Sequence, residues 1–278
     1  MELSRVIVAT DASDAGRAAI QAGRAVAMAS GARLTVMTAA LKSPAAIAAG
    51  RGSWDQGIES AEALARHVRG ELDFQVLPPD VELEVVTGLP GIEVPRYAEE
   101  QAASLIVLGR KPRSHAARLV MGDTADAVAR RSRVPCLIVP PGGTRFERVL
   151  VALDGTVRGE LVFETACAFA RAIGASLGVV TIAPQHDGEP EALAAQVPGA
   201  RAERVARTAR ELAERCGLGV EIIVRRGEPV TEIMAASAGW DVLVVGYHRG
   251  GPPGIIEGGS VARRLAHLVP GALMTVPL

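Results

Sequence analysis

The stretch GYHRGGPPGIIEGGSVARRL, residues 246–265, is rich in glycine and then takes on a helical pattern. Gly258, Gly259 and Ser260 come directly before an expected helix that begins at Val261. The backbone amides and the dipole of such a helix start favour an anion such as phosphate, and Ser260 can cap the helix or donate to a phosphate oxygen. A Gly/Pro surface loop with a serine cap is the other interpretation of the same residues.

The sequence offers little other catalytic or metal-binding chemistry. The glycine loop lacks the lysine of a Walker loop, and no Ser/His/Asp set is suggested by position. We therefore expect no catalytic residue and no metal site made by protein side chains. The histidines show no metal-ligand spacing and are expected to be surface or helix residues, although His248 lies inside the glycine loop and could reach a phosphate there. They are His67, His115, His186, His248 and His267. The cysteines are widely spaced and are expected in the core; they are Cys136, Cys167 and Cys216.

Length and charge limit the class of protein. The chain has 278 residues, of which 49% are hydrophobic, enough for two domains with their own cores. A formal net charge of -1 gives no overall field that would attract nucleic acid or an anionic membrane surface. The start MELSRVIVATDAS does not resemble a leader, and no apolar run approaches the roughly 20 residues of a membrane span. We expect a cytoplasmic protein that binds neither nucleic acid nor membrane.

The chain contains an internal repeat. RVIVATDAS at 5–13 returns as RVLVALDGT at 148–156, and ASLIVLGRKP at 103–112 returns as WDVLVVGYHR at 240–249. Further pairs, ARLTVMTA with ASLGVVTIA and VVTGLP with VRRGEP, lie between them in the same order. The repeat predicts two homologous domains, 1–143 and 144–278, joined by the turn-forming segment 140–147.

Each repeat alternates short Val/Ile/Leu-rich runs with longer segments of helical period. This alternation predicts βαβ units with a buried parallel sheet, and hence an α/β fold. We expect five-stranded sheets of order 3-2-1-4-5. The expected strands are 5–10, 33–38, 82–87, 104–109 and 136–139, then 148–153, 177–182, 220–225, 241–245 and 273–276. The expected helices of the first repeat are 14–30, 56–70, 90–102 and 118–132.

In such a sheet a ligand binds beyond the carboxyl ends of the strands, where the strand order reverses. That point lies between strands one and four. In the second repeat, Asp154 follows strand one and the glycine loop follows strand four, so we expect them to face each other. Asp154 is a ligand-binding residue or a simple turn residue, and the sequence leaves both open.

The order of these elements resembles the universal stress protein family, in its tandem two-domain form. The resemblance rests on Asp154, on Gly227-Glu228-Pro229, and on a loop of the type G-x2-G-x9-G-[S/T], and it covers essentially the whole chain twice. It implies two Rossmann-like domains of the adenine nucleotide alpha hydrolase type. In members that carry the motif it also implies ATP at the loop, with Mg²⁺ held through the phosphates.

The motif transfers to the second repeat with one departure. Arg249 stands at the second motif glycine, where it either bars the close backbone approach or grips phosphate with its guanidinium. Ile182 corresponds to the wall against adenine. The resemblance assigns the nucleotide-binding residues as Leu153, Asp154, Ile182, Gly246, His248, Arg249, Gly259, Ser260 and Val261.

The first repeat departs further. Pro112 replaces the middle glycine and removes an N–H group, and Asp123 replaces the Ser/Thr, where its carboxylate would repel phosphate while still capping a helix. We expect this site to be empty or weakened. The corresponding weaker candidates are Thr10, Asp11, Gly109, Gly122 and Thr124.

These features together predict a regulatory protein of the stress response that binds ATP or a related adenine nucleotide, mainly in its second domain. A scaffold that binds no nucleotide and a slow ATPase are the alternatives. The fifth strands, PCLIVP and ALMTVPL, are short and apolar, and each ends its sheet. We therefore expect the two domains to pair as an intramolecular pseudo-dimer, with a homodimer of whole chains and an unknown protein partner as further options.

Overall fold

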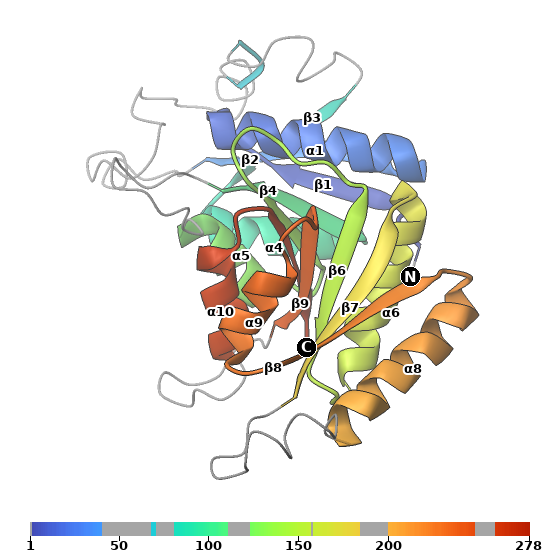
Figure 1. Ribbon diagram of the computed structural model, residues 1–278. Coiled ribbons are helices and arrows are strands. Elements are labelled where there is room, and N and C mark those ends of the chain that lie inside the picture. The colour runs from blue at the N-terminus through green and yellow to red at the C-terminus, as the bar shows by residue number, and fades with distance from the viewer. Residues whose placement is uncertain are drawn as a thin grey trace. The chain divides into compact units, whose positions relative to one another are not determined.

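A computed structural model describes residues 2–40, 68–70, 81–110, 123–156, 158–183, 200–247 and 259–278. The chain divides into two compact units, Leu3–Thr144 and Arg145–Val276, each of which alternates strands and helices (Figure 1). We call them the first and the second domain and describe each by itself.

The first domain is a parallel α/β fold. Its strands lie in the order β3-β2-β1-β4-β5, and every neighbouring pair is parallel. This arrangement confirms the fold and the strand order expected from the sequence. The elements are β1 (Arg5–Ala9), α1 (Asp14–Ser30), β2 (Arg33–Ala40), β3 (Glu82–Thr87), α4 (Pro90–Glu100), β4 (Leu105–Gly109), α5 (Asp123–Arg131) and β5 (Cys136–Val139). Of the helix expected at 56–70, only 68–70 is described, and it is helical.

The second domain repeats this architecture. Its strands lie in the order β8-β7-β6-β9-β10, with β6 parallel to both β7 and β9 and with β7 parallel to β8. The elements are β6 (Arg148–Leu153), α6 (Arg158–Ile173), β7 (Ser176–Ala183), α8 (Ala200–Cys216), β8 (Val220–Arg226), α9 (Pro229–Ala236), β9 (Val242–Tyr247), α10 (Gly259–Leu268) and β10 (Ala272–Pro277).

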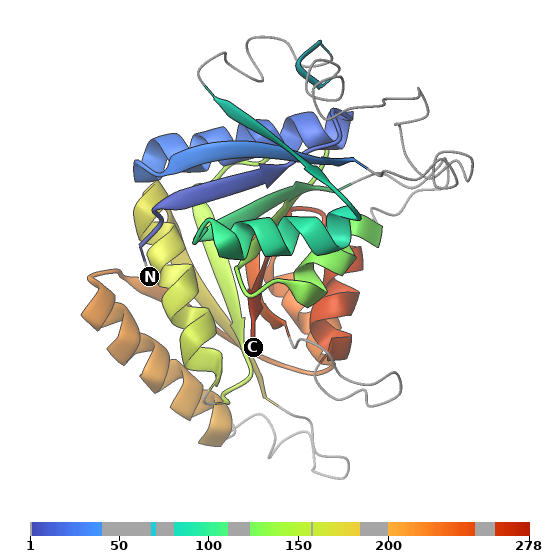
Figure 2. The same ribbon diagram turned by 180° about the vertical axis from the view of Figure 1, so that it is seen from behind.

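Helices cover both faces of each set of strands. In the first domain α1 lies on one face and α4 with α5 on the other, whereas in the second α6 and α8 share a face opposite α9 and α10 (Figures 1 and 2). Right-handed crossovers require this division when the strand order reverses after the third strand. Strands covered on both faces must be apolar throughout, and the central residues Val6, Ile7 and Val8 of β1 are completely buried.

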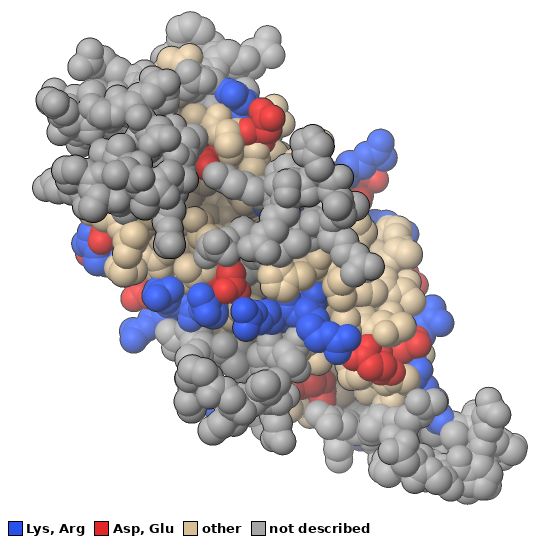
Figure 3. All heavy atoms as spheres, turned by 90° about the vertical axis from the view of Figure 1, so that its left-hand side faces the viewer, with Lys and Arg blue, Asp and Glu red and all other residues tan. Residues whose placement is uncertain are grey.

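The face drawn in Figure 3 carries charges of both signs. On α4, for example, the exposed guanidinium of Arg96 pairs with Glu93 and, at 2.6 Å, with Glu100. These acidic partners raise the pKa of Arg96 above its ordinary value. Exposed pairs of this kind contribute little to stability, so the fold depends mainly on its apolar core.

In each domain, one side chain that accepts two backbone hydrogen bonds fixes the amino end of the first strand. In the first domain, the Oγ of Ser104, just before β4, accepts hydrogen bonds of 2.9 Å from the backbone amides of Ser4 and Arg5. In the second, the Oδ2 of Asp241 accepts bonds of 2.9 Å from the amides of Glu147 and Arg148. Different side chains thus hold the first and fourth strands of each sheet in register.

Trp240, next to Asp241, is a packing residue. Its indole covers Gly178 of β7 so closely that a Cβ there would overlap the ring. The guanidinium carbon of Arg148 lies 4.4 Å from the ring centroid, and its Nη1 donates to the carbonyl of Gly239 at 3.1 Å. A cation over an aromatic face is favourable, so these residues close the amino end of the second sheet.

Glycine at the carboxyl end of the fourth strand permits a close approach in both domains. A Cβ on Gly109 would collide with the backbone carbonyl of Ala15 in the first turn of α1. A Cβ on Gly246 would lie 2.7 Å from Cδ1 of Leu278 and 3.1 Å from Cγ2 of Val162 in α6. The first glycine of the motif therefore has a packing role that does not involve a ligand.

Replacing Gly109 with Ala should destabilise the protein by about 1–3 kcal/mol, because the added methyl group meets main-chain atoms that cannot rotate away. Gly219→Ala is the matched control, since a Cβ there would enter open space. Urea unfolding followed by circular dichroism would measure both variants. Equal midpoints for Gly109→Ala and the wild type would contradict the close approach.

Candidate functional site

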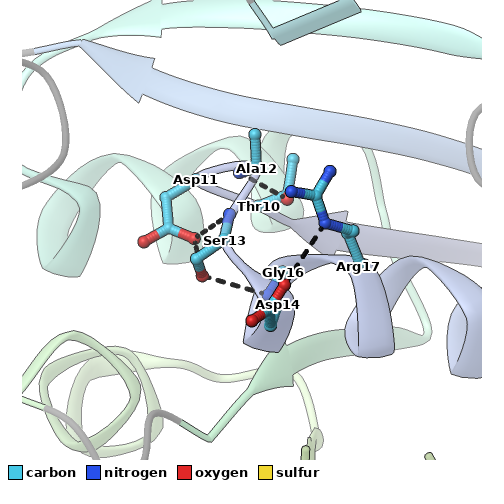
Figure 4. A network of polar contacts seen from close by, with 7 residues as sticks. All are labelled: Thr10, Asp11, Ala12, Ser13, Asp14, Gly16 and Arg17. Carbon is cyan, nitrogen blue, oxygen red and sulfur yellow. Dashed lines mark hydrogen bonds and ion pairs between the residues drawn. The ribbon is translucent and has the colours of Figure 1, made fainter. Parts of the chain in front are cut away.

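The loop between β1 and α1 forms a compact polar turn (Figure 4). The Oδ1 of Asp11 accepts hydrogen bonds from the backbone amide of Ser13, at 3.1 Å, and from its hydroxyl. The Oγ of Ser13 in turn caps α1 by accepting from the amide of Gly16 at 3.3 Å. The Oγ1 of Thr10 accepts from the amide of Ala12 at 3.1 Å. The two candidates Thr10 and Asp11 are thus bound into the turn that starts the first helix.

The second domain builds the same turn from different residues. The Oδ1 of Asp154 accepts from the amide of Thr156 at 2.9 Å and from its hydroxyl at 2.8 Å. The middle residue is left-handed in both turns: Gly155 has φ +72° and Ala12 has φ +60°. Asp154 therefore has the turn role that was one of its two interpretations. Its side chain is exposed, and Oδ2 takes no part in these bonds, so a ligand role stays open.

Four candidates of the second domain lie at the same edge of the sheet. Leu153 ends β6 and pairs in register with Thr181, which places Asp154 beside the last residues of β7. Ile182, half-buried, is one of those residues, and Gly246 lies near the end of β9, the other neighbour of β6. The parallel strands therefore place these four residues at one edge, whereas residues 248–258 of the glycine loop lie outside the described residues.

Helix α10 begins at Gly259, two residues earlier than expected. Gly259 and Ser260 belong to its first turn, whose backbone amides have no partner within a helix. Val261 is half-buried. His248 and Arg249 lie outside the described residues, so the structure does not describe how the departure at Arg249 is accommodated.

The corresponding helix of the first domain, α5, begins at Asp123, followed by the exposed Thr124. A carboxylate at the first position of a helix favours the helix dipole but opposes a second anion at the same end. Gly122 and Pro112 lie outside the described residues. The helix start of the first domain therefore suits phosphate less well than that of the second.

A buried arginine in the first domain is a further difference between the two domains. Arg110 directly follows Gly109 at the end of β4 and has no exposed surface, and burial lowers the pKa of its guanidinium to about 10. Its counterpart in the repeat is Tyr247, which is also buried. The sequence did not indicate this burial, because an arginine after a strand is ordinarily solvated.

The sequence did not indicate that Glu228 and Arg264 form an ion pair. Glu228 caps α9: its Oε2 accepts 2.8 Å bonds from the amide and the hydroxyl of Thr231. Its Oε1 lies 2.8 Å from Nη1 of Arg264, on α10. The bonds from Thr231, and then the bond and the charge of Arg264, lower the pKa of Glu228, so its carboxylate is ionised at neutral pH. The sequence marked Glu228 only as the middle of Gly-x-Pro.

The described residues contain no group of three or more His, Cys, Asp or Glu side chains that could hold a metal ion. Among the same residues, no helix is both long and apolar enough to cross a membrane.

Comparison with known proteins gives relatives of one kind. Residues 2–140 and again 145–277 match the sequence profile of the universal stress protein family. A universal stress protein of Methanocaldococcus jannaschii is 25% identical over 140 residues, which cover 49% of this chain and 81% of that protein. One of Mycobacterium tuberculosis is 28% identical over 203 residues, covering 67% of this chain and 65% of the relative, so the match spans slightly less than two thirds of that protein.

Solved structures agree on the fold. A universal stress protein from Archaeoglobus fulgidus superimposes with a TM-score of 0.73 at 18% identity, covering 100% of this chain and 99% of that one. At this identity the likeness shows the fold alone. The double match to the family profile and the repeated α/β architecture agree on one conclusion: the chain belongs to the universal stress protein family and carries two of its domains in tandem.

Proposed function

We propose that the second domain binds ATP or a related adenine nucleotide, and that its occupancy regulates an interaction with a protein partner in a cytoplasmic stress response. The observation that carries the proposal is the edge at which Asp154, Ile182 and Gly246 come together. Family membership makes nucleotide binding plausible, and the glycine-serine start of α10 fits phosphate chemically.

The proposed roles follow from the chemistry of each group. The amides of the first turn of α10 and the hydroxyl of Ser260 would receive the phosphates, and Ile182 would lie against the adenine. Arg249 and His248 would add positive charge or donors near the phosphates. Asp154 would contact the ligand through Oδ2, because Oδ1 is engaged by Thr156. Mg²⁺, if present, would be held through the phosphates.

A direct experiment tests the proposal. Isothermal titration of the purified protein with ATP, with and without magnesium, would measure binding. Mass spectrometry of small molecules released on denaturation would identify a ligand that survives purification. Absence of binding would favour the non-binding scaffold, and phosphate release in a single-turnover assay would favour the slow ATPase.

Replacing Gly259 with Val should weaken ATP binding at least tenfold, about 1.4 kcal/mol, because the branched side chain would obstruct the approach of phosphate to the helix start. Gly122→Val, at the matching position of the first domain, is the control and should leave the affinity unchanged. Calorimetry on folded variants measures both. Unchanged affinity in Gly259→Val would rule out this loop as the phosphate site.

Titration with ATP should give one site per chain. The reason is the asymmetry between Asp123 at the start of α5 and Ser260 in the first turn of α10, together with Pro112 in the first loop. Calorimetric stoichiometry is the measurement. Two equivalent sites would mean that Pro112 and Asp123 do not disable the first domain.

We also propose that the two domains pair as an intramolecular pseudo-dimer. β5 and β10 are each the last strand in the order of their own domain, and both are short and apolar. Such strands invite pairing, and the linker 140–147 keeps the local concentration of each domain high.

Separate fragments 1–143 and 144–278 should therefore self-associate when the covalent link is removed. Light scattering at concentrations of about 100 μM, well above the micromolar range of ordinary weak association, would measure their mass. Fragments that are folded and strictly monomeric at that concentration would contradict internal pairing.

A further inference from the structure

The two domains join their last two helices by different contacts. In the first domain, Gly91 of α4 lies against Ala127 of α5, so closely that a Cβ on Gly91 would be 2.7 Å from the Cβ of Ala127. In the second domain, the repeat places Val230 at the position of Gly91 and Arg264 at that of Ala127. The small residues that allow this close packing are therefore absent from the matching positions of α9 and α10.

An ion pair stands in their place. Arg264 reaches Glu228, whose counterpart in the first domain is the exposed Leu89, which makes no side-chain cap. The second repeat thus has Glu228 in place of Leu89 and Arg264 in place of Ala127. The glycine loop of the same repeat ends in Gly259-Ser260. A charged pair and an apolar pair are alternative ways to connect the same two helices.

The carboxylate of Glu228 is held in place before it meets the arginine. Oε2 is bonded to the amide and the hydroxyl of Thr231 in the first turn of α9, which leaves Oε1 directed to Nη1 of Arg264. Arg264 is five residues beyond Gly259, on the same helix whose first turn would receive phosphate. The pair therefore connects a capped, fixed turn to the helix of the candidate site.

We propose that Glu228 is a positioning residue that, through Arg264, sets the orientation of α10 and thereby of its first-turn amides toward phosphate. The inference rests on the proposed nucleotide site for its functional consequence. Both side chains are about half exposed, so the pair contributes little to global stability. Its effect falls on the placement of one helix.

The test uses the full chain with four single variants and the Glu228→Gln, Arg264→Gln double variant. Glu228→Gln keeps an oxygen that can cap α9 but removes the charge, and Arg264→Gln removes the partner. Arg264→Lys keeps the charge and should therefore keep most of the wild-type ATP affinity and hydrogen-exchange protection. Arg263→Gln is the matched control, because it removes an equal charge from the neighbouring exposed position of α10 and leaves the pair intact.

Two measurements are made on each variant. Calorimetry with ATP should show binding weakened roughly twofold to fivefold in Glu228→Gln and in Arg264→Gln, as for loss of a surface ion pair, with no further loss in the double variant. Adenosine lacks phosphates, so its affinity should be unchanged. Hydrogen exchange of the free protein should show faster exchange at residues 263–268 of α10, whose amides are bonded within the helix, in the same two variants, and wild-type rates in Arg263→Gln.

The outcomes separate the two proposals. Faster exchange in α10 without any binding of ATP by the wild type would support the positioning role and refute the proposed function. Wild-type exchange in both variants would overturn the positioning role whether or not ATP binds. Equal loss of ATP and adenosine affinity would also overturn it, because that result indicates a general effect on the domain.

Discussion

Each domain depends on the pairing of its first strand with its fourth. This pairing is where the strand order reverses, and in the second domain Leu153, Asp154 and Gly246 lie at its carboxyl end. At the amino end it is fixed by a side chain that accepts two backbone amides, Ser104 in one domain and Asp241 in the other. At the carboxyl end, Gly109 and Gly246 leave room for the first helix of their domain to pack closely against the fourth strand. A shift of register here would separate the residues that the strand ends bring together.

The sequence predicted the fold well because its strongest signal is also the largest energetic term. Continuous apolar runs and intervening helical periods reflect burial of strands on both faces, which the structure shows for Val6, Ile7 and Val8. The repeat doubled that signal, since each copy supports the same assignment. The parallel topology then placed Leu153, Asp154 and Ile182 at one edge.

The parts that could not be predicted depend on contacts between residues far apart in the sequence. Burial of Arg110 depends on what surrounds the end of β4, and the Glu228–Arg264 pair joins residues 36 positions apart. Neither the burial of Arg110 nor this ion pair leaves a periodic pattern in the sequence. The turn at Ala12 was also hidden, because alanine rarely adopts positive φ, and only the matching Gly155 hints at it. Two copies of one fold have thus kept the same backbone while exchanging the side chains that support it.

The stacking of Trp240 has a spectroscopic consequence. The chain has only two tryptophans, and Trp240 is enclosed by Gly178 and the guanidinium of Arg148 within the second domain. Replacing Trp54 with Phe would leave a single indole, whose fluorescence depends on that enclosure. Its emission would then report on the folding of the second repeat alone, so that half of a duplicated chain could be followed without an added label.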